Sequence, residues 1–126
     1  MKKLTILALV IIILAGGFFY SSARAETITD CQALINQTST DLDEVTIGGN
    51  NPEQTRISLQ SKLVGASTKL DEGKNQDAID KLVDFRTSVE KLVSASKPKI
   101  SPEDAALLIT DANNAMACIQ SLIVEG

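Results

Sequence analysis

The chain has no histidine and almost no aromatic residues. Its 126 residues include no tryptophan, and three of the four aromatic residues, Phe18, Phe19 and Tyr20, lie near the amino terminus. Without histidine there is no imidazole general base, no imidazole ligand for haem or zinc, and no Ser–His or Cys–His nucleophile pair. The remaining aromatic residue, Phe85, falls on an inward helix face, so a stacking platform for sugars or single-stranded nucleic acid is not expected. The sequence predicts no catalytic and no cofactor-binding residue.

Long apolar runs are also missing, with one exception between Leu4 and Tyr20. This run follows the basic start Met1–Lys3 and precedes small residues that end at Ala25. The order predicts a bacterial secretory signal peptide cleaved after Ala25, which leaves residues 26–126 as a secreted or periplasmic chain with no membrane association. The alternative is a retained anchor, because a run of this length reaches the short end of the membrane-spanning range, roughly 17–25 residues.

Cysteine is scarce. Cys31 and Cys118 are the only two, and no Cys-x-x-Cys spacing suggests thioredoxin-like redox chemistry. In an exported chain, two cysteines are interpreted first as one disulfide, with two free buried thiols as the alternative.

Positive charge is in short supply as well. Loss of Lys2, Lys3 and Arg24 with the leader would lower the bases from 12 to nine against 16 acids, so the net charge would become −7. An acidic surface repels phosphate backbones and anionic membranes, and nucleic acid is therefore not an expected partner. About 100 residues suffice for one small domain with a single core, here residues 26–126.

Four segments show apolar residues at three- and four-residue steps, and glycine and proline fall between the segments. The predicted inward residues are, in chain order, Ile28, Cys31, Ile35, Leu42 and Val45, then Leu59, Leu63, Ala66 and Leu70, then Ile79, Leu82, Phe85, Val89 and Leu92, and finally Ala105, Leu108, Ile109, Ala112, Met116, Ile119 and Ile123. No segment alternates like a strand. The predicted fold is all-α, an up-down-up-down four-helix bundle.

Residues typical of helix starts and helix ends lie at the boundaries of these segments. Asn51 is expected to cap the second helix, with Pro52 at its first position and Gln54 reaching back as in a capping box. Gly73 is expected to stop that helix, and Ser101 to cap the fourth.

The cysteines agree with this topology. In such a bundle the start of the first helix meets the end of the fourth, and Cys31 and Cys118 each lie about two turns from that shared end at a rise of about 1.5 Å per residue. We therefore expect one disulfide between the first and fourth helices.

Acidic residues are the only repeated polar feature. Asp77, Asp80 and Asp84 share one helix face, and Asp41, Asp43 and Glu44 precede the first glycine turn. Paired carboxylates can perform acid–base chemistry, but interleaved lysines favour a solvated face, and no calcium-loop pattern is present. No metal ligand is predicted.

The three later helices resemble the FIMAH-type helical domain of secreted bacterial proteins. The similarity lies in Leu59-x-x-Lys62-Leu63-x-x-Ala66, in Leu70-Asp71-x-Gly73, in Ala78-Ile79-x-Lys81-Leu82-x-x-Phe85 and in Ile100-Ser101-x-Glu103-Asp104-Ala105. The resemblance implies an accessory module of extracellular enzymes and surface proteins, associated with carbohydrate or cell wall.

These observations favour an exported, non-enzymatic interaction module that binds a protein or cell-envelope partner. The first connection, Thr46 to Asn51, is the expected partner face. A small periplasmic chaperone or enzyme inhibitor is the alternative, and an enzyme acting through Asp77, Asp80 and Asp84 is a third hypothesis.

Overall fold

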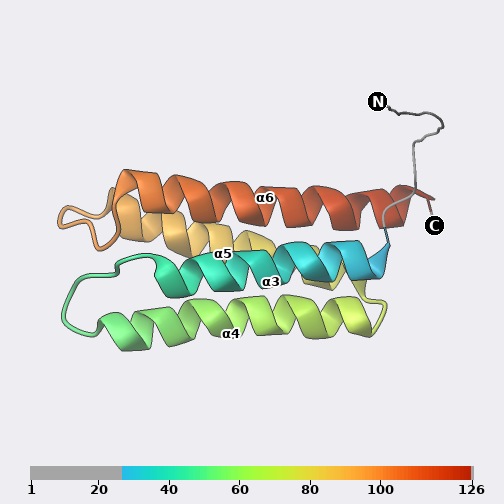
Figure 1. The fold of residues 1–126 in the computed structure, drawn as a ribbon, viewed down its shortest axis with the longest axis horizontal. Coiled ribbons are helices and arrows are strands. Elements are labelled where there is room, and N and C mark those ends of the chain that lie inside the picture. The colour runs from blue at the N-terminus through green and yellow to red at the C-terminus, as the bar shows by residue number, and fades with distance from the viewer. Residues whose placement is uncertain (1–26, 126) are drawn as a thin grey trace, which may run out of the picture.

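The computed structural model describes residues 27–125, and these form four α-helices (Figure 1). The helices are α3 (Ile28–Glu44), α4 (Pro52–Asp71), α5 (Asn75–Ser94) and α6 (Pro102–Glu125). Residues 27–125 contain no strand. The predicted signal peptide lies outside the described residues.

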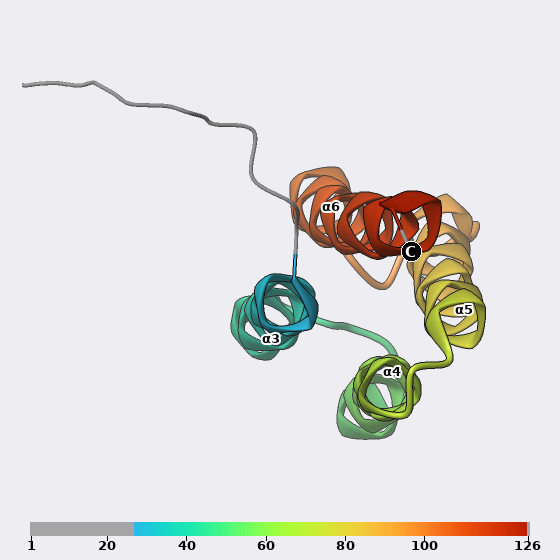
Figure 2. The ribbon, with the colours of Figure 1, turned by 90° about the vertical axis from the view of Figure 1, so that its right-hand side faces the viewer.

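The helices form an up-down-up-down bundle, as predicted. Each helix packs against the next in the chain, and α6 returns to pack against α3 (Figure 2). Residues 72–74 alone connect α4 to α5, with Gly73 at a φ of 78°. Because this turn is so short, α4 and α5 lie antiparallel side by side.

The core follows the predicted stripes closely. Phe85, Leu82 and Leu108 are fully buried, and so is Thr38, whose hydroxyl donates to the Leu34 carbonyl at 2.8 Å. Two predictions of buried residues are wrong, since Ile28 is 45% exposed and Ile123 is 37% exposed. Both lie in a terminal helical turn, at the end of the bundle where α3 begins and α6 ends.

The helix ends agree only in part with the predicted caps. The Ser101 hydroxyl accepts from the Asp104 amide at 3.1 Å, as expected for a cap. The Asn51 side chain makes no cap hydrogen bond, so the predicted capping box with Gln54 is wrong. The reason lies in the Asn51 backbone, which has left the usual extended cap conformation (φ −132°, ψ 65°). A capping box that was not predicted joins Thr27 and Asp30 at the start of α3.

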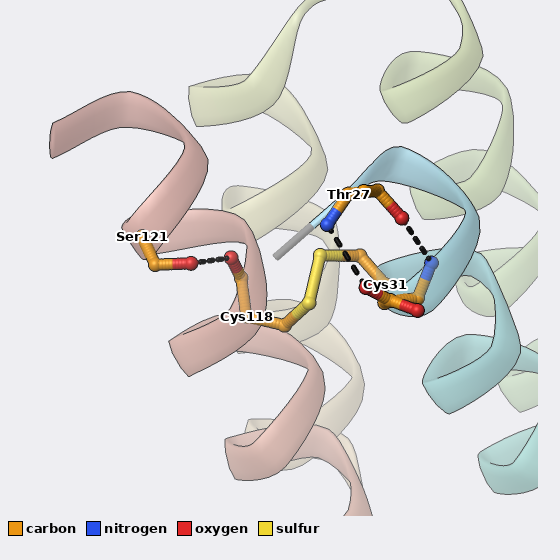
Figure 3. Close-up of a disulfide and its surroundings, with 5 residues drawn as sticks. Thr27, Cys31, Cys118 and Ser121 are labelled. Atoms are coloured by element: carbon orange, nitrogen blue, oxygen red, sulfur yellow. Dashed lines mark hydrogen bonds between the residues drawn. A yellow bond between two sulfur atoms is a disulfide. The ribbon is translucent and has the colours of Figure 1, made fainter. Parts of the chain in front are cut away.

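A disulfide between Cys31 and Cys118 joins α3 to α6 (Figure 3). The two Cα atoms lie 5.5 Å apart, within the usual range for a bridge. The predicted pairing is therefore confirmed, and the alternative of two free thiols is excluded. Such a bond fits an oxidising, exported location.

Polar side chains form several hydrogen bonds across the contact between α3 and α4. The Gln32 amide donates to the Ser67 carbonyl at 3.0 Å and to Asp71 at 2.7 Å, and the Ser39 hydroxyl donates to Gln60 at 2.7 Å. The Arg56 guanidinium donates to the carbonyls of Leu42 and Val45 at the end of α3. These bonds satisfy carbonyls that a helix end leaves without an intrahelical partner.

Among residues 27–125, α6 is the one helix that could cross a membrane by length and composition, with a mean hydropathy of 1.3 from Pro102 to Val124. In this fold the helix supplies one side of the core, where Leu108, Ala112, Ala115 and Ile119 are fully buried. Because 28% of this apolar stretch is buried, core packing accounts for part of its apolar composition.

Candidate functional site

The two long connections of the bundle meet at one end. Residues 45–51 join α3 to α4 and residues 95–101 join α5 to α6, and both lie opposite the end that carries the disulfide (Figure 1). The Gly48 amide donates to the Lys99 carbonyl at 2.7 Å and ties the two connections together. Each connection buries one isoleucine, Ile47 in the first and Ile100 in the second, with 6% and 4% of their surface exposed. The connections therefore form a packed layer over the core.

An open pocket of about 980 Å³ lies at this end. We call it the loop-end pocket; it is lined by residues 49–51 and 97–99 of the two connections, by residues between 54 and 59 of α4, and by residues between 88 and 92 of α5. Its size is at the upper end of the range for ligand sites, about 300–1,000 Å³. It can accommodate a ligand larger than a simple ion.

Three lysines give the pocket its charge. Lys91 comes from the last turns of α5, and Lys97 and Lys99 come from the following connection. None of the described residues that line the pocket is acidic. Within residues 27–125 the ion pairs join Lys69 and Lys74 to Glu72, so the three pocket ammonium groups are without a carboxylate partner there. A locally basic pocket thus occurs in a chain with an excess of acids.

Lys99 is held in place by its backbone and by its stem. Its amide donates to the Leu92 carbonyl at 3.0 Å, and its carbonyl accepts from Gly48. Its aliphatic stem lies against Gly49, where a β-carbon would come within 3.1 Å of Cδ and Cε of Lys99. Because Gly49 has a φ of 94°, its backbone conformation favours glycine, and an added β-carbon would also displace the Lys99 stem by a few tenths of an ångström.

Amide and hydroxyl groups make up most of the remaining lining. They belong to Asn50, Asn51, Gln54, Thr55, Ser58 and Ser88. Asn51 and Gln54, which were predicted to form the capping box of α4, both line this pocket. Half-buried Leu92 and exposed Pro98 add apolar surface, and buried Leu59 also lines the pocket. The pocket offers positive charge, hydrogen-bond donors and an apolar strip together.

We expect Gly49→Ala to cost about 1–2 kcal/mol of stability, since alanine strains a backbone with positive φ. Gly73→Ala is the matched control, because Gly73 has a similar φ of 78° but nothing within 4 Å of the added methyl group. Urea unfolding should show comparable losses for both variants. Only Gly49→Ala should also shift the NMR signals of Lys99, and equal Lys99 spectra in the two variants would contradict the contact.

The predicted partner face, Thr46 to Asn51, lies partly in this pocket. Gly49, Asn50 and Asn51 line it, whereas Thr46 lies on another side of the connection, with its amide 3.4 Å from the Asp104 carboxylate. The three pocket lysines are not among the residues predicted from the sequence. A signal was available, since the segment from Lys91 to Ser101 contains three lysines and no acid in an acidic chain.

The predicted acidic features separate in the structure. Asp77, Asp80 and Asp84 are all exposed on α5, and no group of three or more potential metal ligands occurs within residues 27–125. Asp43 accepts a hydrogen bond from Gln60 at 2.8 Å.

Asp41 instead faces Asp111 across the contact between α3 and α6. Burial first, and then the hydrogen bond and negative charge of Asp41, raise the pKa of Asp111 from 3.8 to about 7. The Asp41 carboxylate also accepts from the Gln37 amide at 3.0 Å. The pair lies within the body of the bundle, apart from the loop-end pocket.

This pair predicts a stability that falls as the pH rises. Between pH 3.8 and about 7 the folded protein retains a proton on Asp111 that the unfolded chain has lost, so the free energy of unfolding decreases across that interval. The Asp111→Asn variant cannot ionise at this position. At pH 8 its free energy of unfolding should exceed that of the parent by about 1–2 kcal/mol, a value already reduced for solvent screening. Near pH 4 the two free energies of unfolding should be closer to each other. Urea unfolding at several pH values measures the difference. Exposed Asp84→Asn is the control, and a gain independent of pH would contradict the carboxyl pair.

Comparisons with protein-family models, with curated proteins and with solved structures found no match to this chain.

Proposed function

We propose that this protein is an exported, non-enzymatic module that binds a protein partner through the loop-end pocket. The signal peptide ending at Ala25 and the accessory role implied by the FIMAH-type resemblance are parts of the same proposal. The observation that carries it is the open pocket of about 980 Å³ with three unpaired lysines, on a bundle closed at its other end by a disulfide.

The composition of the pocket favours binding over chemistry. Its lining contains lysines, amides, hydroxyls and a few apolar side chains, and the chain has no histidine to act as a base beside them. Such groups orient a ligand and neutralise its charge. The same composition favours a specific binder over a general chaperone, because unfolded clients are held by apolar surface.

The test is photo-crosslinking in cells that produce the protein. A photoreactive amino acid is placed at Asn50 in the pocket, at Asp84 on α5, or at Gln120 on α6, all of which are exposed. We expect one protein adduct of defined mass from Asn50, and none from the other two positions. Absence of a specific adduct from every position would overturn the proposed function.

A further inference from the structure

The loop-end pocket carries an inference about its ligand, which rests on the proposed function. We propose that the pocket binds an extended acidic peptide segment of the partner, with peptide carboxylates placed on Lys91, Lys97 and Lys99. Charge complementarity, the chemistry of the neutral lining and the restrained backbone at Lys99 support this assignment.

Charge is the first argument. Three of the nine basic residues that follow Ala25 line this one pocket, and no acid lines it with them. Ammonium groups without a carboxylate partner attract an anion, and the opposite sign of the remaining surface would repel it elsewhere. The ligand that these groups select is therefore negatively charged.

The neutral lining identifies the class of anion. Asn50, Asn51 and Gln54 present side-chain amides that can pair with the N–H and C=O groups of a peptide backbone. Half-buried Leu92 and exposed Pro98 add apolar surface for an aliphatic side chain between the carboxylates. An acidic glycan would favour an aromatic stacking surface, and Phe85, the one aromatic residue after the leader, is fully buried. A carboxylate-rich peptide thus fits better than a carboxylate-rich sugar.

The backbone on one side of the pocket is also held in place before a ligand arrives. The Lys99 backbone is bonded at both its amide and its carbonyl, and its stem lies against Gly49. Less backbone freedom is then lost on binding, although the exposed lysine side chains must still be ordered by the ligand. The start of α4 lies beside the lysines with its Asn51 cap bond unmade, and the positive end of that helix adds to the same field.

The experiment selects peptides without assuming their sequence. A random peptide library displayed on phage is panned on the oxidised protein, and phage that also bind the Lys91→Gln, Lys97→Gln, Lys99→Gln triple variant are removed. We expect the surviving peptides to be enriched in Asp and Glu around an aliphatic residue. Panning that yields no enrichment of acidic residues would overturn the proposal.

A matched triple variant separates position from net charge. Lys62→Gln, Lys74→Gln, Lys81→Gln removes the same three charges from outside the pocket. By fluorescence polarisation, a selected synthetic peptide should bind the pocket variant about tenfold or more weakly, since three exposed charge pairs contribute modestly each. The control variant should bind like the parent, and equal losses in both variants would overturn the assignment to this pocket. Circular dichroism and urea midpoints establish that both variants are folded.

Two further binding measurements distinguish an acidic peptide from other anions. Oligogalacturonate supplies carboxylates on a sugar backbone, and inorganic polyphosphate supplies phosphates. In the contrary result, either probe binds the parent more tightly than the selected peptides do and loses that binding in the pocket variant. That result would assign the pocket to the probe's class of anion and overturn the proposal. A charge swap adds a positive test. The Lys99→Glu variant should bind an acidic peptide more weakly than the parent does, and should bind better a peptide in which a single Glu is replaced by Lys.

Failure of this inference and failure of the proposed function give different results. If crosslinks form from Asp84 or Gln120 but not from Asn50, the protein is a binding module that uses another face, and the pocket assignment alone is wrong. If Asn50 crosslinks to a partner whose contacting segment is not acidic, the site stands and the ligand class is wrong.

Discussion

Opening the disulfide is expected to lower the free energy of unfolding by about 4–5 kcal/mol. Cys31 and Cys118 are separated by 87 positions, so their bond closes a loop that includes almost the whole domain. In the chain-entropy description, a long loop restricts the unfolded chain strongly, and the folded state gains stability by comparison. A small domain of this size has a total stability of about 5–15 kcal/mol, so the loss is a large share of it.

The test compares the parent with Cys31→Ala, Cys118→Ala by urea unfolding, each with and without reductant. The reductant should destabilise the parent and leave the variant unchanged. Because the unfolded chain becomes more expanded without the bond, the slope of the unfolding free energy against urea should also increase. A loss below about 1 kcal/mol would mean that the unfolded chain is already compact, and would contradict this account.

The disulfide and the loop-end pocket lie at opposite ends of the bundle (Figure 1). The covalent bond fixes the end where α3 begins and α6 ends, near exposed Ile28 and Ile123. At the other end, the two connections are held by one backbone hydrogen bond, Gly48 to Lys99, and by buried Ile47 and Ile100. The covalent contribution to stability therefore lies apart from the residues proposed to bind.

Periodic apolar spacing was sufficient to predict the helices and their order. The stripe Leu59, Leu63, Ala66 and Leu70 is buried as expected, and Phe85 is fully enclosed. This works because a helix must bury one face, and the three-residue turn at Gly73 leaves one antiparallel arrangement for its neighbours. The cysteine pairing followed from the same geometry.

Other features could not be predicted from apolar spacing or from helix-start residues. Thr38 interrupts the first stripe, yet it is buried because its hydroxyl bonds to the Leu34 carbonyl one turn earlier. The Asn51–Pro52 sequence is typical of a helix start, but Asn51 lines the pocket and leaves the cap unmade. Helix propensity describes the start of α4 and does not determine its side-chain bonds.

The loop-end pocket was only half predicted for a related reason. The connection Thr46 to Asn51 stood out by its glycines and asparagines, whereas Lys97 and Lys99 lie nearly fifty positions later in the chain. Their meeting depends on the bond between Gly48 and Lys99, which joins two connections with no sequence relation. The Asp41–Asp111 pair is a similar case, because two acids far apart in sequence become neighbours only when α3 packs on α6.

Replacing Phe85 by alanine is expected to cost about 3–5 kcal/mol of stability. The side chain is fully buried on α5, which packs between α4 and α6. Alanine would forfeit the transfer free energy of the ring and leave an apolar cavity that the surrounding helices fill only in part. Phe85→Leu retains most of the volume and should cost about 1.5 kcal/mol or less. Ile57→Ala, at a site that is 53% exposed, should change stability by about 0.5 kcal/mol or less.

The cavity and the disulfide should act independently, because the cavity destabilises the folded state and the disulfide restricts the unfolded chain. Their summed cost is about 8 kcal/mol, which falls within the range of total stabilities for a domain of this size. Phe85→Ala is therefore expected to fold while oxidised and to lose most of its helical circular dichroism when reduced, whereas the reduced parent retains its helices. A reduced Phe85→Ala protein as helical as the reduced parent would show that the cavity has been filled by repacking, and that the core tolerates the loss of its one large ring.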